Sequence, residues 1–218
     1  MKPCPTSGRW AAVFLLAGLT VPRAADAQVG KNRGALEPNL ATKEQLLAVP
    51  GIDAALADAI IAGRPYMDML ALDKVIGPKL SAEQKAATLA KLWIPLNLNT
   101  ASREEILLVP GVGARMLREF LEYRPYAALA QFQREIGKYV DDQELARLEQ
   151  YVYVPIDLNT ASDEDILTIP GVGSRMLREF KEYRPWRSIE QFRREIGKYV
   201  SKDEVARLER YVTIKPGA

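Results

Sequence analysis

Apolar residues recur at three- and four-residue intervals in short segments through most of the chain, which is typical of amphipathic helices. In the stretch from about Ser174 to Tyr183, for example, Met176, Leu177 and Phe180 fall on one face of a helix. No segment alternates apolar and polar residues for long enough to predict a sheet. The pattern therefore predicts an all-α protein.

Serine, threonine, glycine and proline residues mark where these helices begin and end. A hydroxyl residue followed three positions later by an acidic residue or glutamine predicts a capped helix start, and this pattern occurs as Thr42 with Gln45, Ser102 with Glu105, and Ser162 with Asp165. In the last third of the chain the first helix is predicted to stop at Pro170-Gly171 and the second at Pro185. The third begins at Ser188 with Gln191 and ends at Gly197. A fourth helix is capped by Ser201 with Glu204 and carries Val205, Leu208 and Val212. These signals predict four helices in two hairpins.

The same punctuation returns three times at one fixed spacing. Self-similarity at a fixed period is the signature of a repeat architecture. The residues that recur at equivalent positions are Pro50, Pro110 and Pro170; Arg64-Pro65, Arg124-Pro125 and Arg184-Pro185; and Ile76-Gly77, Ile136-Gly137 and Ile196-Gly197. The predicted units are 37–96, 97–156 and 157–214, of which the second and third are about two-thirds identical and the first is diverged. Short junctions that contain proline, 94–96 and 154–156, lead us to expect units that pack or keep a restricted angle.

The first part of the chain, 1–27, has the pattern of an export signal. Lys2 and Arg9 precede an apolar run from Trp10 to Val21, and the small residues of Ala25-Asp26-Ala27 follow as a cleavage site. This run is shorter than the about 20 apolar residues of a membrane span, so we expect a mature form without a span, beginning with a flexible linker at 28–36. Residues 1–27 are thus a predicted signal peptide, and the protein is expected to be exported, to the periplasm if the host is Gram-negative.

Composition narrows the chemistry. The chain has no histidine, which removes imidazole catalysis and histidine-ligated metals, and its one cysteine, Cys4, lies in the predicted signal. Without residues 1–27 the chain loses three bases and one acid, which leaves 27 of each. We therefore expect no catalytic residues, no metal and no cofactor. A polyanionic partner would have to be held by local geometry and local charge.

The turn between the first two helices of a unit is the informative motif. Pro110-Gly111-Val112-Gly113 and Pro170-Gly171-Val172-Gly173 each join two helices, and glycine permits positive φ and close approach of another backbone. We expect the valine to pack back between the helices. The amides that follow are the free N–H groups of a helix N-terminus, which favours binding of phosphate. Basic residues follow on the same helices, so the candidate anion-binding residues are Gly111, Val112, Gly113, Ala114, Arg115 and Arg118, with Gly171, Val172, Gly173, Ser174, Arg175 and Arg178.

The segments Asn99-Thr100-Ala101-Ser102 through Gly113, and Asn159-Thr160-Ala161-Ser162 through Gly173, resemble helix-hairpin-helix domains of the ComEA type. ComEA proteins are exported DNA receptors for natural transformation, and their fold is a paired helix-hairpin-helix. The resemblance covers nearly all of 37–214 and implies three tandem domains of this kind. It also implies binding of double-stranded DNA without base preference, through hairpin amides on phosphates, as part of DNA uptake with envelope DNA-transport proteins as further partners.

This chain departs from the family pattern in three places. The first hairpin reads Pro50-Gly51-Ile52-Asp53, with a carboxylate where phosphate would approach, so we expect a poor DNA site there. The usual small alanine of the second helix is kept as Ala57 but replaced by Leu117 and Leu177, which predicts a different helix spacing in the later units. The second hairpin of each unit has a single glycine and is expected to be structural.

Other interpretations of the same residues stay open. The arginines could form a solvated face paired with Glu119, Glu122, Glu179 and Glu182, and the series Arg64, Arg124 and Arg184 could cap helix C-termini. Tyr126 and Trp186 are expected to be core anchors. If one unit dominates DNA contact, the basic segment with Arg187, Arg193, Arg194 and Lys198 favours the third. The main alternative function is a cell-envelope scaffold for protein–protein contacts, whereas an enzyme is not expected from 218 residues of repeats.

Overall fold

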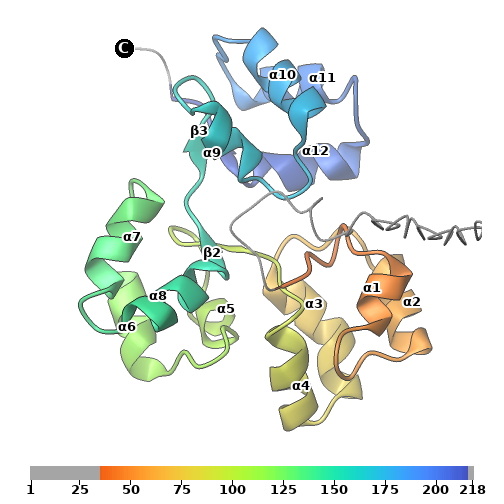
Figure 1. Ribbon diagram of the computed structural model, residues 1–218. Helices are drawn as coiled ribbons and strands as arrows, with labels where there is room; N and C mark the ends of the chain where they lie inside the picture. The colour runs from red at the N-terminus through yellow and green to blue at the C-terminus, as the bar shows by residue number, and fades with distance from the viewer. Residues whose placement is uncertain (1–34, 216–218) are drawn as a thin grey trace, which may run out of the picture.

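A computed structural model describes residues 35–215, and these residues are predominantly helical. They form twelve α-helices, four to each predicted unit (Figure 1). The prediction of a mainly α-helical protein is confirmed. The predicted signal peptide and most of the predicted linker lie outside the described residues.

The helices of the first unit are α1 (Lys43–Leu47), α2 (Ala54–Ala62), α3 (Met69–Ile76) and α4 (Ala82–Leu89), with a 3-10 turn η2 (Gly77–Lys79) before α4. Those of the second unit are α5 (Arg103–Leu107), α6 (Ala114–Glu122), α7 (Leu129–Ile136) and α8 (Asp142–Glu149). Those of the third unit are α9 (Asp163–Leu167), α10 (Ser174–Glu182), α11 (Ile189–Ile196) and α12 (Lys202–Glu209).

The predicted capping residues are N-caps in the structure. At α1, α5 and α9 the hydroxyl of the cap accepts from the third helical amide, and the side chain at that third position accepts from the cap's own amide. Ser188 and Ser201 likewise accept from the amides of Gln191 and Glu204 at the starts of α11 and α12. Capping satisfies amides that an isolated helix end leaves without partners. It therefore explains why helices as short as α1, α5 and α9 begin where they do.

Each unit begins and ends in a short extended segment, and the two segments pair in parallel. β1 (Leu96–Asn97) pairs with β2 (Val152–Tyr153), and β3 (Ile156–Asp157) pairs with β4 (Val212–Thr213). Leu36 and Leu92 form the corresponding bridge of the first unit. Placing Val212 on the fourth helix was wrong, because α12 ends at Glu209 and Val212 belongs to β4. Strands this short cannot show alternation in the sequence.

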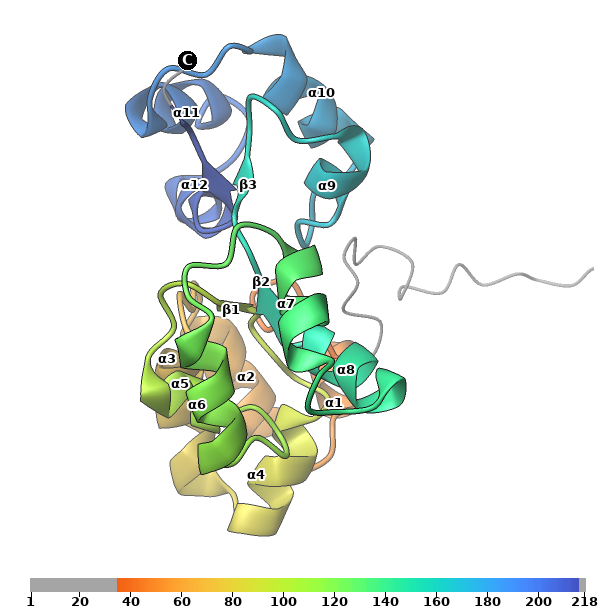
Figure 2. The ribbon, with the colours of Figure 1, turned by 90° about the vertical axis from the view of Figure 1, so that its left-hand side faces the viewer.

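The three units are in contact with one another. Figure 2 shows the third unit at one end of the molecule, with the first two at the other end. Buried residues from Ala35 to Val152 form one continuous core through the first two units, whereas Leu158 to Val212 form the separate core of the third. The first and second units therefore share one hydrophobic core, and the third unit has a core of its own.

Aromatic residues at the ends of the units hold these contacts. Trp93 Nε1 donates to the carbonyl of Tyr151 at 2.9 Å, and the two rings meet edge to face at 5.0 Å. One repeat later, the Tyr153 hydroxyl donates to the carbonyl of Arg210 at 2.9 Å. The Arg210 guanidinium in turn donates to the carbonyl of Pro95 at 3.1 Å. Neighbouring units therefore pack, as the stiff junctions lead one to expect.

Candidate nucleic-acid interface

The two Gly-Val-Gly turns have the same backbone. Gly111 and Gly171 have φ values of +80° and +78°, a region that glycine occupies without the steric penalty of a Cβ. Val112 and Val172 point inward and are 8% and 0% exposed, as expected for residues that pack between the helices of the hairpin. The turn is thus a rigid corner, fixed by one left-handed glycine and one buried valine.

The second glycine of each turn has a different role. Gly113 and Gly173 are the N-cap residues of α6 and α10, with φ of −104° and −105°. The positive φ that glycine permits is therefore not used at these two positions, whose backbone other residues could also adopt. A Cβ placed on either glycine would have nothing within 4 Å in the described part of the chain. Glycine here leaves open space in front of the helix.

The starts of α6 and α10 are uncapped. Among the described residues no side chain makes a capping hydrogen bond at either helix. The first-turn amides of an α-helix have no partner within the helix, so the amides of Ala114, Arg115 and their counterparts face the open space. Partial positive charge concentrates at such an end and favours an anion.

In the first unit a capping side chain occupies the position that is open in the other two hairpins. Asp53 is the N-cap of α2, and its carboxylate accepts from the amide of Leu56 at 2.7 Å. The carboxylate both occupies one donor and places a negative charge where an anion would bind. The expectation that this hairpin is a poor phosphate site agrees with this geometry.

The arginines beside the open ends are exposed. Arg118 and Arg178 have 71% exposed side chains, and their ion pairs in the described part of the chain are long ones to the adjacent carboxylates, Glu119 at 3.7 Å and Glu179 at 4.0 Å. Within residues 35–215, no ion pair is formed by Arg115 or Arg175. The interpretation of a solvated face is thus met in part, because Arg118 and Arg178 are exposed and pair with Glu119 and Glu179. Among residues 35–215 no arginine pairs with Glu122 or Glu182. The first-turn arginines are available for an external anion.

The bases singled out in the third unit are mostly neutralised, and two of them, Arg194 and Lys198, have counterparts in Arg134 and Lys138 of the second unit. Arg193 makes two hydrogen bonds to Glu209, at 2.7 and 2.5 Å. Arg194 and Lys198 both pair with the buried Glu195. Only Arg187, which is exposed, forms no ion pair among the residues from 35 to 215. The local charge of the third unit is thus closer to that of the second than its composition implies.

The Arg64, Arg124 and Arg184 series has a structural role other than the predicted helix C-cap. The guanidinium of Arg124 donates to the carbonyl of Ala101 at 2.8 Å, and Arg184 does the same to Ala161 at 2.7 Å. These carbonyls precede the first helix of the unit, so the arginine ties the end of the second helix to the start of the first. Burial lowers the pKa of Arg124.

The same loops contain an asparagine bracket that the motif analysis missed. Asn99 Nδ2 donates to the carbonyl of Tyr126 at 2.9 Å, and the Tyr126 amide donates back to Asn99 Oδ1 at 2.7 Å. Asn39 with Tyr66 and Asn159 with Trp186 repeat it. The recurrence of asparagine at the same place in each unit was the available signal. The bracketed Tyr126 and Trp186 are 2% and 1% exposed, which confirms both as core anchors.

The second hairpin of each unit is closed by its own side chains. Asp141 and Ser201 cap α8 and α12, so the amides there already have an acceptor. A Cβ on Gly137 would lie 2.6 Å from the carbonyl oxygen of Gln133, which explains the glycine by close packing. In the later units Leu117 is buried and Leu177 half-buried, where the first unit has a fully buried Ala57.

No protein-family model matches the chain, and neither a curated protein nor a solved structure is significantly similar to it. Within the described helices, none is both long and apolar enough to cross a membrane. Residues 35–215 also contain no cluster of three acidic, histidine or cysteine side chains that could hold a metal ion. Function must therefore be inferred from the hairpins themselves.

Proposed function

We propose that this protein binds double-stranded DNA without sequence preference, through the amides of its second and third hairpins and the arginines beside them. The observation that carries the proposal is the pair of helix starts without a side-chain cap at Gly113 and Gly173, each open in front and followed by an exposed arginine that forms no ion pair within residues 35–215. Backbone amides and arginine side chains recognise phosphate oxygens. Contacts to phosphates position a duplex but carry no base information.

The repeated unit supports an assignment to tandem paired helix-hairpin-helix domains of the ComEA type. In each unit a capped helix, a Gly-x-Gly or Gly-x-Asp turn and a second helix precede another helical hairpin. With the predicted signal peptide, this assignment makes the protein an exported, non-enzymatic DNA-binding protein of a DNA-uptake pathway. Its place would be the periplasm of a Gram-negative host, together with envelope DNA-transport proteins.

A second candidate function is an envelope scaffold that binds other proteins. The observation in its favour is the first unit, where Asp53 closes the hairpin and which packs on both other units. The balanced charge of residues 28–218 also gives no long-range attraction to a polyanion. The scaffold function predicts that the protein does not bind DNA and that changes in the hairpins affect protein partners instead.

A salt series separates the two functions. The full chain is titrated into a fluorescent duplex of random sequence, and anisotropy is followed as the salt concentration rises. Contacts with roughly three to six phosphates predict a log–log slope of about −3 to −5. Binding with this slope, unchanged by DNA sequence, supports the DNA function. Absence of binding at about 50 mM salt would favour the scaffold.

A double variant tests the mechanism. Gly113→Asp with Gly173→Asp copies Asp53 into both open hairpins, and we expect DNA binding to be lost while the helical content is kept. The matched control is Gly113→Ala with Gly173→Ala, which adds a Cβ in open space without a cap or a charge. The control should bind DNA nearly as well as the wild type. If the aspartate variant is folded and still binds DNA with the wild-type affinity, the hairpin mechanism is wrong.

A further inference from the structure

The second and third hairpins are nearly identical in sequence but differ in their surroundings. Leu107, at the end of α5, is 47% exposed, whereas its counterpart Leu167 is half-buried. Pro110 is half-buried and Pro170 is buried. The end of the first hairpin helix and the proline that follows it are therefore more exposed to solvent in the second unit than in the third.

The residues that support the two turns differ in the same direction. Arg147 on α8 and Arg207 on α12 lie behind the first glycine, and each has an Nη2 atom 3.0 Å from the position of a Cβ on that glycine. Each guanidinium is held by two hydrogen bonds to the glutamate three residues earlier. The Arg147 side chain is nevertheless 31% exposed, whereas that of Arg207 is 1% exposed.

The first unit covers one side of the third hairpin. Two methyl carbons of Leu40 lie 3.0 and 3.4 Å from the position of a Cβ on Gly171. The buried carboxylate of Glu37 lies in the field of Arg207 and Arg210. At Gly111, by contrast, the described atoms within 4 Å of such a Cβ belong only to Arg147 of the same unit.

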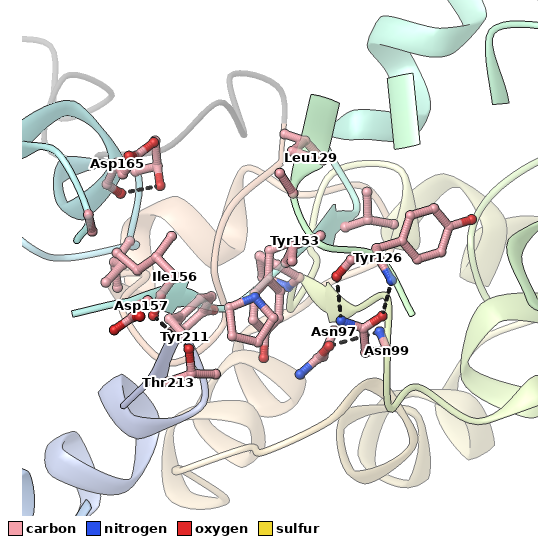
Figure 3. Close-up of a pocket in the computed structure, with 18 of the residues that line it drawn as sticks. Asn97, Asn99, Tyr126, Leu129, Tyr153, Ile156, Asp157, Asp165, Tyr211 and Thr213 are labelled. Carbon is pink, nitrogen blue, oxygen red and sulfur yellow. Dashed lines mark hydrogen bonds between the residues drawn. The ribbon is translucent and has the colours of Figure 1, made fainter. Parts of the chain in front are cut away.

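The second unit lies on another side of the third hairpin. A cavity of about 640 Å³ lies between the second and third units, and Ile169 and Pro170, just before the turn of the third hairpin, help to line it. Figure 3 shows its walls, with Tyr126 and Leu129 contributed by the second unit and Asp165 by the third. The third hairpin therefore has the first unit beside Gly171 and the second unit beside Pro170, whereas the second hairpin contacts the first unit through α5.

We infer that the second hairpin is the principal docking point for duplex DNA and that the third hairpin is mainly a joint between the units. A DNA duplex is wide compared with a hairpin turn. A hairpin can therefore contact its phosphates only where the neighbouring protein surface does not clash with the rest of the duplex. Among the described atoms, a Cβ on Gly111 would meet only Arg147 of the same unit, whereas Leu40 of the first unit lies against Gly171 and the second unit lies beside Pro170. The inference rests on the proposed DNA function and reverses the preference for the third unit that its composition suggested.

Charge favours the same hairpin. Arg147 is partly exposed beneath Gly111 and adds positive potential close to the amides of α6. Arg207 is buried, and besides its partner Glu204 it faces Glu37 of the first unit. Of the two arginines behind the turns, Arg147 is therefore the one within reach of an external anion, because its side chain is partly exposed and that of Arg207 is buried.

Two single variants of the full chain test the inference, Gly113→Asp and Gly173→Asp. They are matched, because both glycines have an extended backbone, free space for a Cβ, and the conformation that Asp53 already adopts in the first unit. Affinity for a random-sequence duplex is measured by anisotropy at fixed salt. We expect Gly113→Asp to weaken binding by at least about tenfold and Gly173→Asp by less than about threefold.

The outcomes separate the inference from the function on which it rests. Equal losses, or a larger loss for Gly173→Asp, would overturn the preference for the second hairpin and leave DNA binding through hairpins intact. Two folded variants that both bind as well as the wild type would overturn the proposed function as well. Amide hydrogen exchange gives an independent measurement on the unmodified chain. DNA should protect the amides of 114–116 more than those of 174–176, and the reverse order would contradict the inference.

Discussion

The first and second hairpins have the same backbone and opposite chemistry. Gly51 and Gly111 both turn through positive φ, at +83° and +80°, and Ile52 and Val112 are both buried. The difference is the next residue, which is Asp53 in one unit and Gly113 in the other. One side chain decides whether the amides of the following helix are satisfied internally or left for a ligand.

This difference shows that a capping side chain stabilises the helix but uses an amide that could otherwise bind a ligand. An aspartate N-cap typically adds about 1 kcal/mol of stability relative to alanine, and the first unit has that contribution through Asp53 and Leu56. The second unit has glycine at this position, which is less stabilising by about a few tenths of a kcal/mol, and it keeps the amide donors free at the protein surface. Sites that bind ligands commonly retain groups that the fold alone would have satisfied.

Transfer of the open hairpin to the first unit is the strongest test of the comparison. In the Gly113→Asp, Gly173→Asp background, Asp53→Gly with Ala55→Arg rebuilds in α2 the glycine and arginine of α6. Leu47 beside this hairpin is 45% exposed, so the site is accessible. We expect about tenfold recovery of DNA affinity, measured by anisotropy. Ala55→Arg alone, with Asp53 kept, is the control and should recover little. Recovery of equal size in the control would mean that charge, rather than free amides, is responsible.

Loss of the cap should lower stability more in the first unit than in the second. Asp53→Ala removes the hydrogen bond to the Leu56 amide, and we expect the free energy of unfolding to fall by about 1 kcal/mol. Gly113→Ala removes no side-chain hydrogen bond, and we expect a smaller loss, because glycine is only somewhat better than alanine without such a bond to lose. Urea denaturation of the full chain, followed by circular dichroism, measures both variants. A loss from Gly113→Ala as large as that from Asp53→Ala would show that the glycine is required by the fold.

Arginine variants sharpen the description of the open site. Arg115→Gln removes an unpaired charge on the first turn of α6, and we expect about threefold weaker DNA binding and a salt slope that is less steep by about one. Arg118→Gln removes a charge already 3.7 Å from Glu119, so its effect should be smaller. Salt-dependent anisotropy measures both variants. Identical effects would show that Glu119 does not hold Arg118 away from the duplex.

The smallest expected effect is a dependence of stability on pH that the first unit lacks. Lys138 and Arg134 hold the pKa of Glu135 below its ordinary value of 4.5, and Lys198 and Arg194 do the same for Glu195. Because the folded-state pKa values are lowered, this stabilisation is fully present above about pH 4.5 and is lost as the pH falls through the lower folded values. The first unit has Val75 at this position.

Denaturation at a series of pH values between about 6 and 3 measures this effect. Glu135→Gln with Glu195→Gln should make the free energy of unfolding fall less steeply on acidification than in the wild type. Val75→Ala, which removes side-chain atoms but no charge, serves as a control for the loss of packing. An unchanged acid profile in the glutamine variant would show that these two pairs contribute nothing to stability.

Local features of the fold were predictable from the sequence. The caps Thr42, Ser102 and Ser162 and the breaks at Gly137 and Gly197 depend on residues a few positions apart, and the structure confirms them. Amphipathic spacing likewise identified the helices. Such signals are visible because the interactions that they report close within one helical turn.

Features that depend on distant residues were not predictable. The Asn99 bracket joins positions 27 residues apart, and the Arg124 contact to Ala101 spans 23. The Arg210 contact to Pro95 spans 115 residues. The packing of Leu40 on the third hairpin likewise arises only when the units assemble. The candidate hairpin residues were therefore identifiable from the sequence, but their unequal accessibility was not.

The parallel pairing of the first and last strands has a consequence for how such a chain can evolve. In each unit the segment that leaves runs beside, and in the same direction as, the segment that arrived, as β1 with β2 and β3 with β4 show. The next unit starts almost at once, because β2 ends at Tyr153 and β3 begins at Ile156. Tandem duplication in steps of one whole unit can therefore lengthen the protein without reversing or rerouting its path. The similarity of the second and third units, which are about two-thirds identical, is the expected trace of one such step.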